Sequence, residues 1–252
     1  MGAAAWRTAS LADGLLAAKR WIPAAAMGGT LPLLAALPWG GGWHQGLSGL
    51  LLALLWLAAI RRDAMGIGVG IILVGFASHA ALAIALSCYA PALAEPVLID
   101  GAAYWEAQVR WIRSGWDPEY ELINWLPAHV QLAAAVALFS YLSLGGIAIL
   151  HGFYEVDLMN FYVGRLLAGA ERPLPCLLVG WHPWSVMRGL CYAFLVFEVA
   201  SLSLSRLSGR VLCTRARRVL RWKVAALFFV ADCGLKAFAL EPVRATLERC
   251  LG

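Results

Sequence analysis

The chain has 252 residues, of which 62% are hydrophobic and only 14% are charged, with a net charge of +5. Soluble domains carry about 25% charged residues, so this composition excludes an ordinary soluble fold. The positive charge does not indicate nucleic-acid binding, because cytoplasmic loops of membrane proteins are themselves enriched in Lys and Arg.

The first apolar segment follows the basic residues Arg7, Lys19 and Arg20, an order that resembles a signal peptide. However, the apolar run from Trp21 to Leu37 contains two prolines and is followed at once by further apolar segments. We therefore interpret it as a retained first helix.

Apolar segments that approach the roughly 20 residues needed to cross a bilayer recur along the chain. Residues 64–94 contain no side chain that is charged at neutral pH. The sequence predicts an all-α, polytopic transmembrane bundle with six to seven crossings, forming a single integral membrane domain over residues 1–252. The candidate crossings are Trp21–Pro38, His44–Ile60, Ala64–Ala90, Pro127–Ile149, Gly152–Ala170, Ser185–Arg206 and Trp222–Leu240.

Basic residues gather in three segments: Lys19 with Arg20, Arg61 with Arg62, and the stretch 210–223. These segments fall on one side of the membrane only if Gly152–Ala170 crosses, a point that the sequence leaves open. The positive-inside rule then predicts a cell (inner) membrane protein with its N-terminus in the cytoplasm and its C-terminus outside.

The longest stretch between apolar runs is the mixed, rather acidic segment 95–125. Its middle part places Tyr104, Trp105, Val109, Trp111 and Ile112 largely on one side of a helix, and Ser114-Gly-Trp-Asp-Pro ends that helix. We expect an extracytoplasmic amphipathic segment that lies in the membrane interface, with a substrate-gripping lid as the alternative.

The six cysteines contain no CxxC pair, and most lie in apolar surroundings. They are predicted to be small core residues and to form neither a disulfide framework nor a zinc site. They are Cys88, Cys176, Cys191, Cys213, Cys233 and Cys250.

Polar side chains inside a bilayer are costly, so they face a partner or a cavity. The candidates in this chain are His151, Glu155, Asp157, Asn160, His182, Arg188, Glu198, Asp232 and Lys236. Spacing predicts that His151 and Glu155 share one helix face, and that Asp157 and Asn160 share another.

Two further local patterns concern helix starts and ion pairs. Pro183 and Ser185 are typical of a helix start, with Ser185 as the N-cap. Asp232 and Lys236 stand in the favourable order for a helical ion pair four residues apart.

These residues support three alternatives. The first is interhelical salt bridging, in which Asp232 pairs with Lys236, and Glu155, Asp157 or Glu198 pairs with Arg165 or Arg188. The second is a metal, proton or catalytic site built from His151, Glu155, Asp157 and His182. The third is an ion path lined by Glu155, Asp157, Glu198 and Asp232. No catalytic motif is present, so no catalytic residue is assigned, and the metal and cofactors stay unknown.

Small residues predict close helix packing at Gly66, Gly68, Gly70, Gly145 and Gly146. Packing of this kind suits a rigid bundle better than a loose membrane anchor.

Three stretches together carry a family resemblance. Leu142-Ser-Leu-Gly-Gly-Ile-Ala-Ile-Leu-His-Gly-Phe looks like a small-residue helix and its turn, and Trp181-His-Pro-Trp-Ser-Val-Met-Arg looks like the next helix start. Val230-Ala-Asp-Cys-Gly-Leu-Lys-Ala-Phe-Ala-Leu-Glu-Pro-Val looks like a terminal helix. In this order they resemble the stage II sporulation protein M family over residues 64–245. His151 stands where the family has Asn, the second stretch lacks the family's Gly and Glu, and Lys236 lies near the family's terminal Glu. The resemblance implies an assembly or transport-related membrane subunit.

The leading hypothesis is therefore a non-enzymatic, multi-span membrane subunit, a permease-like or scaffold component of a membrane complex. Its expected partners are the lipid bilayer and either another protein or a second copy of the chain, with no nucleic acid. The alternative is a membrane-embedded enzyme that acts on a lipid-like substrate through a His/carboxylate site.

Overall fold

The computed structural model describes residues 20–116 and 121–252, and within them it contains ten helices and no strand, which confirms the all-α prediction. Arg7 and Lys19 lie outside the described residues. The helices are α2 (Trp21–Ala36), α3 (Trp43–Arg61), α4 (Met65–Tyr89), α5 (Pro91–Ala94), α6 (Gly101–Ser114), α7 (Leu122–Ser143), α8 (Gly146–Gly169), α9 (Pro173–Gly180), α10 (Pro183–Ser208) and α11 (Arg215–Cys250).

Four of these helices, α3, α4, α7 and α10, are long and apolar enough to cross a membrane. Helix α2 is apolar but shorter. Each of the seven predicted crossings overlaps a helix, although Pro127–Ile149 runs from α7 into α8. However, α8 carries Glu155, Asp157 and Arg165, and α11 begins with a basic stretch. The described helices therefore support a membrane protein, while six to seven crossings are not confirmed.

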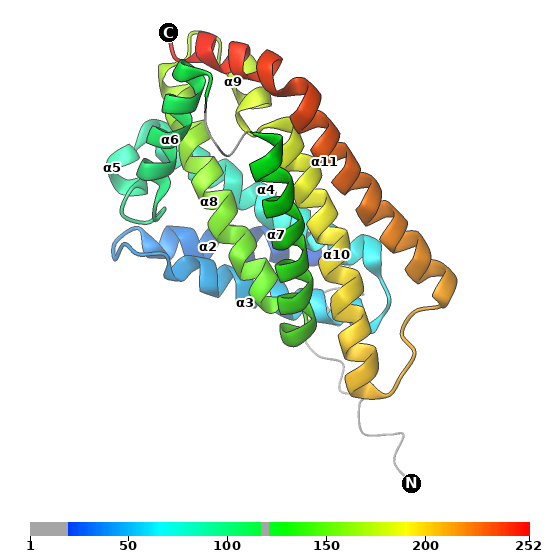
Figure 1. Ribbon diagram of the computed structural model, residues 1–252. Helices are drawn as coiled ribbons and strands as arrows, with labels where there is room; N and C mark the ends of the chain where they lie inside the picture. The colour runs from blue at the N-terminus through cyan, green and yellow to red at the C-terminus, as the bar shows by residue number, and fades with distance from the viewer. Residues whose placement is uncertain (1–19, 117–120) are drawn as a thin grey trace.

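The helices form two packed groups that meet where α7 contacts α8 and where α10 contacts α3 and α4 (Figure 1). Helices α2, α3 and α4 pack on one another, and α8 packs against α3 and α4. Helix α10 lies between α7 and α11 and also contacts α3 and α4. The main core contains Trp56 and Phe197, whose rings meet edge to face with centroids 5.3 Å apart.

Glycines allow several of these close approaches. A Cβ at Gly68 would meet Phe197, and one at Gly70 would meet Trp21, as the sequence predicted. Gly66 and Gly146, by contrast, face open space. Helices α2 and α4 also cross closely at Gly29, where a Cβ would collide with the backbone carbonyl of Gly75.

Two predicted helix boundaries are wrong. The break between α7 and α8 lies at Leu144 and Gly145, whose φ angles of 54° and 90° are both left-handed, and not between residues 149 and 152. Likewise, α10 begins at Pro183 with His182 as its N-cap, so Ser185 lies inside the first turn. In both cases the helix begins after a residue with positive φ, Gly145 or His182, that lies before the predicted start.

The amphipathic helix predicted within 95–125 is present as α6, and it ends where Gly115 adopts a left-handed φ of 71°. Its apolar side packs on other helices of the bundle. Trp111 and Ile112 are buried, and α6 packs against α8 and α11. Residues 117–120 of the predicted segment, including Asp117 and Glu119, lie outside the described residues.

The cysteine prediction is wrong for one pair, because Cys176 of α9 and Cys250 at the end of α11 form a disulfide. The two residues are 74 positions apart and no local motif joins them, but packing of α9 on α11 brings their Cα atoms to 5.9 Å. The other described cysteines are free, and two of them, Cys191 and Cys213, are buried core residues as predicted.

The two ends of the molecule differ in chemistry. At one end, Asp63 in the α3–α4 turn forms ion pairs with Arg217 and Arg221 at the start of α11, so two basic segments meet there. We call this the basic end. At the other end, α6, α9 and the disulfide-linked end of α11 lie together (Figure 1).

Candidate functional site

A pocket of about 720 Å³ lies between α4, α7, α8 and α10. Its volume falls within the range of roughly 300–1,000 Å³ that is usual for small-molecule sites. Most of its wall is apolar, including Trp56, Phe76, Val136 and Val196, and residues from α6 and α9 complete one side. The site is therefore suited to a molecule that is largely hydrocarbon.

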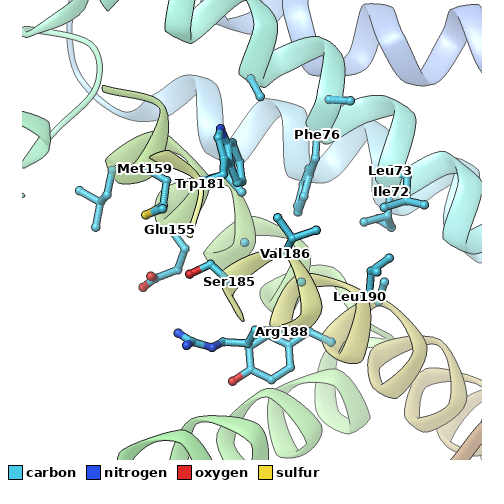
Figure 2. Close-up of a pocket in the computed structure, with 18 of the residues that line it drawn as sticks. Ile72, Leu73, Phe76, Glu155, Met159, Trp181, Ser185, Val186, Arg188 and Leu190 are labelled. Atoms are coloured by element: carbon cyan, nitrogen blue, oxygen red, sulfur yellow. The ribbon is translucent and has the colours of Figure 1, made fainter. Parts of the chain in front are cut away.

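Three polar residues of the pocket lie together at one side. Figure 2 shows Glu155, Ser185 and Arg188 close to one another, whereas Ile72 and Leu190 lie on the opposite side. Glu155 projects from α8, and Ser185 and Arg188 project from the first two turns of α10. We call these three residues the polar side of the pocket.

The pocket is not closed. Leu73, Leu177 and Val186 line it and remain exposed. Because α4 and α10 are candidate membrane spans, the medium around this opening would be lipid.

Two glycines line the pocket wall. A Cβ at Gly152 would press on the ring of Phe76, at 2.9 Å. A Cβ at Gly189 would meet nothing within 4 Å, although Gly189 lines the pocket. Position 189 therefore faces free space and can accept a larger side chain.

The structure places the predicted site residues in several separate places. His151 and Glu155 share a face of α8, as predicted, with Nε2 and Oε1 3.6 Å apart at the pocket wall. That separation is too long for a hydrogen bond, and both side chains are well exposed.

Asp157 lies elsewhere, in a fully buried cluster with His44 of α3 and His79 of α4. Its Oδ2 lies 2.9 Å from Nε2 of His44, and its Oδ1 lies 2.5 Å from Nε2 of His79. Gln45 donates to Oδ2 at 2.8 Å. Asn160, one turn further along α8, is also fully buried.

Asp232 is held by Arg188, which the sequence had assigned to other acids. Nε of Arg188 donates to Oδ2 at 3.1 Å, and Nη2 donates to Oδ1 at 3.3 Å. His129 lies 3.9 Å from the same carboxylate, and the ammonium of Lys236 lies over the ring of Trp125, 5.1 Å from its centroid.

Glu198 also has partners that the sequence did not predict. Its carboxylate pairs with Arg218 at 2.7 Å and with Arg221 at 3.3 Å. This network links α10 to the beginning of α11 at the basic end.

His182 is buried among Trp111, Tyr162 and Trp184 in the turn before α10. Burial, together with the positive charges of Lys236 and Arg188, lowers the pKa of His182 to about 3. The ring is therefore neutral at physiological pH.

The proposed convergence of His151, Glu155, Asp157 and His182 does not occur. His151 and Glu155 lie at the pocket wall, Asp157 lies in the cluster with His44, and His182 stacks on Trp184. The four carboxylates of the suggested ion path likewise have separate surroundings. Sequence reasoning missed His44, Gln45 and His79 as site residues. His79 did carry a signal, since it is an imidazole within the stretch 64–94, and intramembrane ionisable groups mark functional sites.

No family model, curated protein or solved structure matches this chain. The resemblance to the stage II sporulation protein M family therefore stays a prediction. The fold defines a class, that of all-helical proteins with several helices long and apolar enough to span a membrane, and the pocket supports a more particular proposal.

Proposed function

We propose that this chain is a multi-span membrane protein that holds an amphipathic, lipid-like molecule in its pocket, as a permease-like or scaffold subunit of a membrane complex. The observation that carries the proposal is the composition of the pocket, an apolar wall with a polar side at Glu155, Ser185 and Arg188.

The polar side indicates what the head of the ligand would contain. Arg188 and Ser185 supply hydrogen-bond donors, and Glu155 supplies an acceptor. Because Arg188 is already paired with Asp232, the local charge is largely balanced. This combination favours a small head that both donates and accepts hydrogen bonds, such as a hydroxyl or a zwitterion, over a multiply charged head.

A pocket-filling variant tests this proposal. Gly189→Leu should place its side chain into the pocket, whereas Gly234→Leu on α11 adds the same side chain at a position that also has nothing within 4 Å and does not line the pocket. We expect lipid-like molecules to remain bound to the wild-type protein and to Gly234→Leu after gentle solubilisation, and native mass spectrometry should detect them. Gly189→Leu should retain at least tenfold less of this bound material than the wild type. Equal retention by both variants, or no retained molecule on the wild type, would overturn the proposal.

We do not extend the proposal to catalysis, because the His and carboxylate residues of the alternative enzyme hypothesis lie in separate places. The proposal does include a protein partner or a second copy of the chain. A gently solubilised sample that contains only partner-free monomer would count against this part.

The orientation is also a proposal, and two features at opposite ends of the molecule support it. Disulfides persist in oxidising compartments, so the end with Cys176 and Cys250 would lie outside the cytoplasm. The basic end, with Arg61 and the start of α11, would then be cytoplasmic, in line with the positive-inside rule. With this orientation, the α6 region would lie on the extracytoplasmic side of the inner membrane.

A further inference from the structure

We propose that His44, His79 and Asp157 bind one divalent transition-metal ion of the zinc type inside the bundle. The three side chains come from α3, α4 and α8, and all are fully buried. One ligand atom from each lies within 4.8 Å of the others. Two imidazoles and one carboxylate are a donor set that zinc and non-haem iron sites use.

The hydrogen bonds of His79 require a cation between the ring and Asp157. Nδ1 of His79 lies 2.8 Å from the carbonyl oxygen of Gly29, which can only accept, so Nδ1 carries the hydrogen. In a neutral ring Nε2 is then a bare acceptor, yet it faces Oδ1 of Asp157 at 2.5 Å. Two acceptors can approach this closely only with a proton or a metal ion to share.

The groups around the three ligands have the arrangement of a metal site. Metal-binding imidazoles usually donate their second ring nitrogen to a carbonyl or carboxylate, and His79 does so to Gly29. Ligand carboxylates are themselves hydrogen-bonded, and Gln45 donates to Asp157. His44 and Gln45 stand in the first turn of α3, so the carboxylate that they contact lies near the positive end of that helix's dipole.

The cluster and its surroundings also contain buried polar atoms that make no hydrogen bond with the described residues. Nδ1 of His44 and both amide atoms of Asn160 are buried and have no hydrogen-bond partner among the described residues. Asn160 and Asp157 are three residues apart on one helix, which puts their Cβ atoms about 5–6 Å apart. The Asn160 amide is thus placed near a fourth ligand of the ion, such as a water molecule.

Only a small adjustment would admit the ion. Zinc holds nitrogen and oxygen ligands at about 2.0–2.2 Å in a tetrahedron, so neighbouring ligand atoms are about 3.3 Å apart. The present separations of 2.5 and 2.9 Å between imidazole and carboxylate would each lengthen by less than about 1 Å.

The metal site is separate from the pocket. Phe153 lies between them, since its ring packs on His79 at 5.0 Å and on Phe76 of the pocket wall at 4.6 Å. The ion would therefore join α3, α4 and α8, with α2 held through Gly29, and would not touch a ligand in the pocket. This inference does not depend on the proposed function.

Metal content measured on the purified protein tests the site. We expect the wild type, incubated with one equivalent of zinc and then desalted, to retain close to one ion per chain. His79→Gln and Asp157→Asn should retain less than a tenth of that amount. The matched control is His129→Gln, which removes another buried imidazole that lies beside Asp232.

Two further readouts use the wild-type chain, so the test does not depend on the folding of the variants. Zinc should raise the thermal midpoint of the wild type, because a ligand that binds only the folded state stabilises it. Cobalt should give visible absorption bands of a four- or five-coordinate site. Wild-type protein that retains no zinc, shows no shift and gives no cobalt bands would overturn the proposal and leave a shared proton in the cluster. Equal zinc content in His79→Gln would overturn it as well.

Discussion

Individual residues of this protein hold conformations that their neighbours impose, and His182 is the clearest case. It adopts a φ of 45°, which non-glycine residues rarely accept, and its ring is enclosed by three aromatic side chains. Such a residue persists only where the surrounding packing compensates for the strain. His182 thus fixes the entry of the chain into α10, the helix that carries Ser185 and Arg188.

The buried ring of His182 should make stability depend on pH. Its pKa is about 3 in the folded protein and about 6.5 in the unfolded chain, so only the unfolded state gains a proton between these values. Stability is therefore fully present above about pH 6.5 and falls as the pH decreases toward 3. Between pH 7 and pH 5 the expected loss is about 2 kcal/mol.

Thermal unfolding in detergent at pH 7 and pH 5 measures this effect. The comparison is His182→Asn, which tolerates a left-handed φ and does not titrate. We expect the variant to be less stable at pH 7 but to lose less stability on acidification than the wild type. An identical pH dependence of the two proteins would contradict the assignment.

Gly29 is a second residue at which a single atom matters. A Cβ there would collide with the carbonyl of Gly75, so Gly29→Ala should force α2 away from α4. The free energy of unfolding should fall by about 1–3 kcal/mol. Gly66→Ala is the matched control, since nothing lies within 4 Å of its added methyl group and alanine favours helix by about 0.5–1 kcal/mol. Unfolding midpoints of the two variants should therefore move in opposite directions.

The sequence could show which residues were exceptional but not where they meet. Asp157 stands out in an apolar helix, whereas its partners His44 and His79 are 113 and 78 residues away. Only the packing of α8 on α3 and α4 brings them together. Short-range pairs could be predicted, as His151 and Glu155 show, because helix geometry alone places them.

At the scale of elements, α11 is attached to the bundle at its start by buried charge. Arg221 is only 7% exposed and pairs with Asp63 at 2.6 Å and Glu198 at 3.3 Å, while Arg217 pairs with Asp63 but is 69% exposed. Arg221→Leu removes charge-assisted hydrogen bonds of a nearly buried side chain but leaves Arg217 beside Asp63 and Arg218 beside Glu198, so it should cost about 1.5–3 kcal/mol. Arg217→Leu should cost less than about 1 kcal/mol, since solvent screens an exposed pair.

A double-mutant cycle with Asp63→Asn checks the assignment. The coupling free energy measured with Arg221 should exceed that measured with Arg217 severalfold. Equal coupling would show that solvent screens both pairs alike, and the attachment of α11 would then have to rest on its apolar contacts with α10.

Helix locations were predictable, because apolar stretches are long and each predicted crossing overlaps a helix of the structure. The helix boundaries were harder to predict. Leu144 is left-handed with a φ of 54°, and leucine gives no sequence signal for that conformation. Membrane crossing by α8 was undecidable for a physical reason, since its three charged residues lower its hydropathy whether or not they are buried.

For the whole molecule, the two ends carry opposite chemical signatures, and together they predict a topology. The turn around Trp39 lies at the disulfide end, since the Gly41 amide bonds to Pro96, and the segment around Val211 lies at the basic end. Trp39 is 82% exposed and Val211 is 89% exposed, so a cysteine at either position would be open to reagents.

Labelling of intact cells with a membrane-impermeant maleimide should therefore modify Trp39→Cys, while Val211→Cys should react only after the cells are opened. In the same cells Cys176 and Cys250 should resist alkylation until a reductant is added, because the outer compartment keeps them oxidised. Replacement of both by serine should cost about 2–5 kcal/mol, since the bond closes a loop 74 residues long. Labelling of Val211→Cys in intact cells would reverse the orientation. Free thiols at positions 176 and 250 would remove the argument that the disulfide end lies outside the cytoplasm. The proposed orientation would then be supported by the basic segments alone.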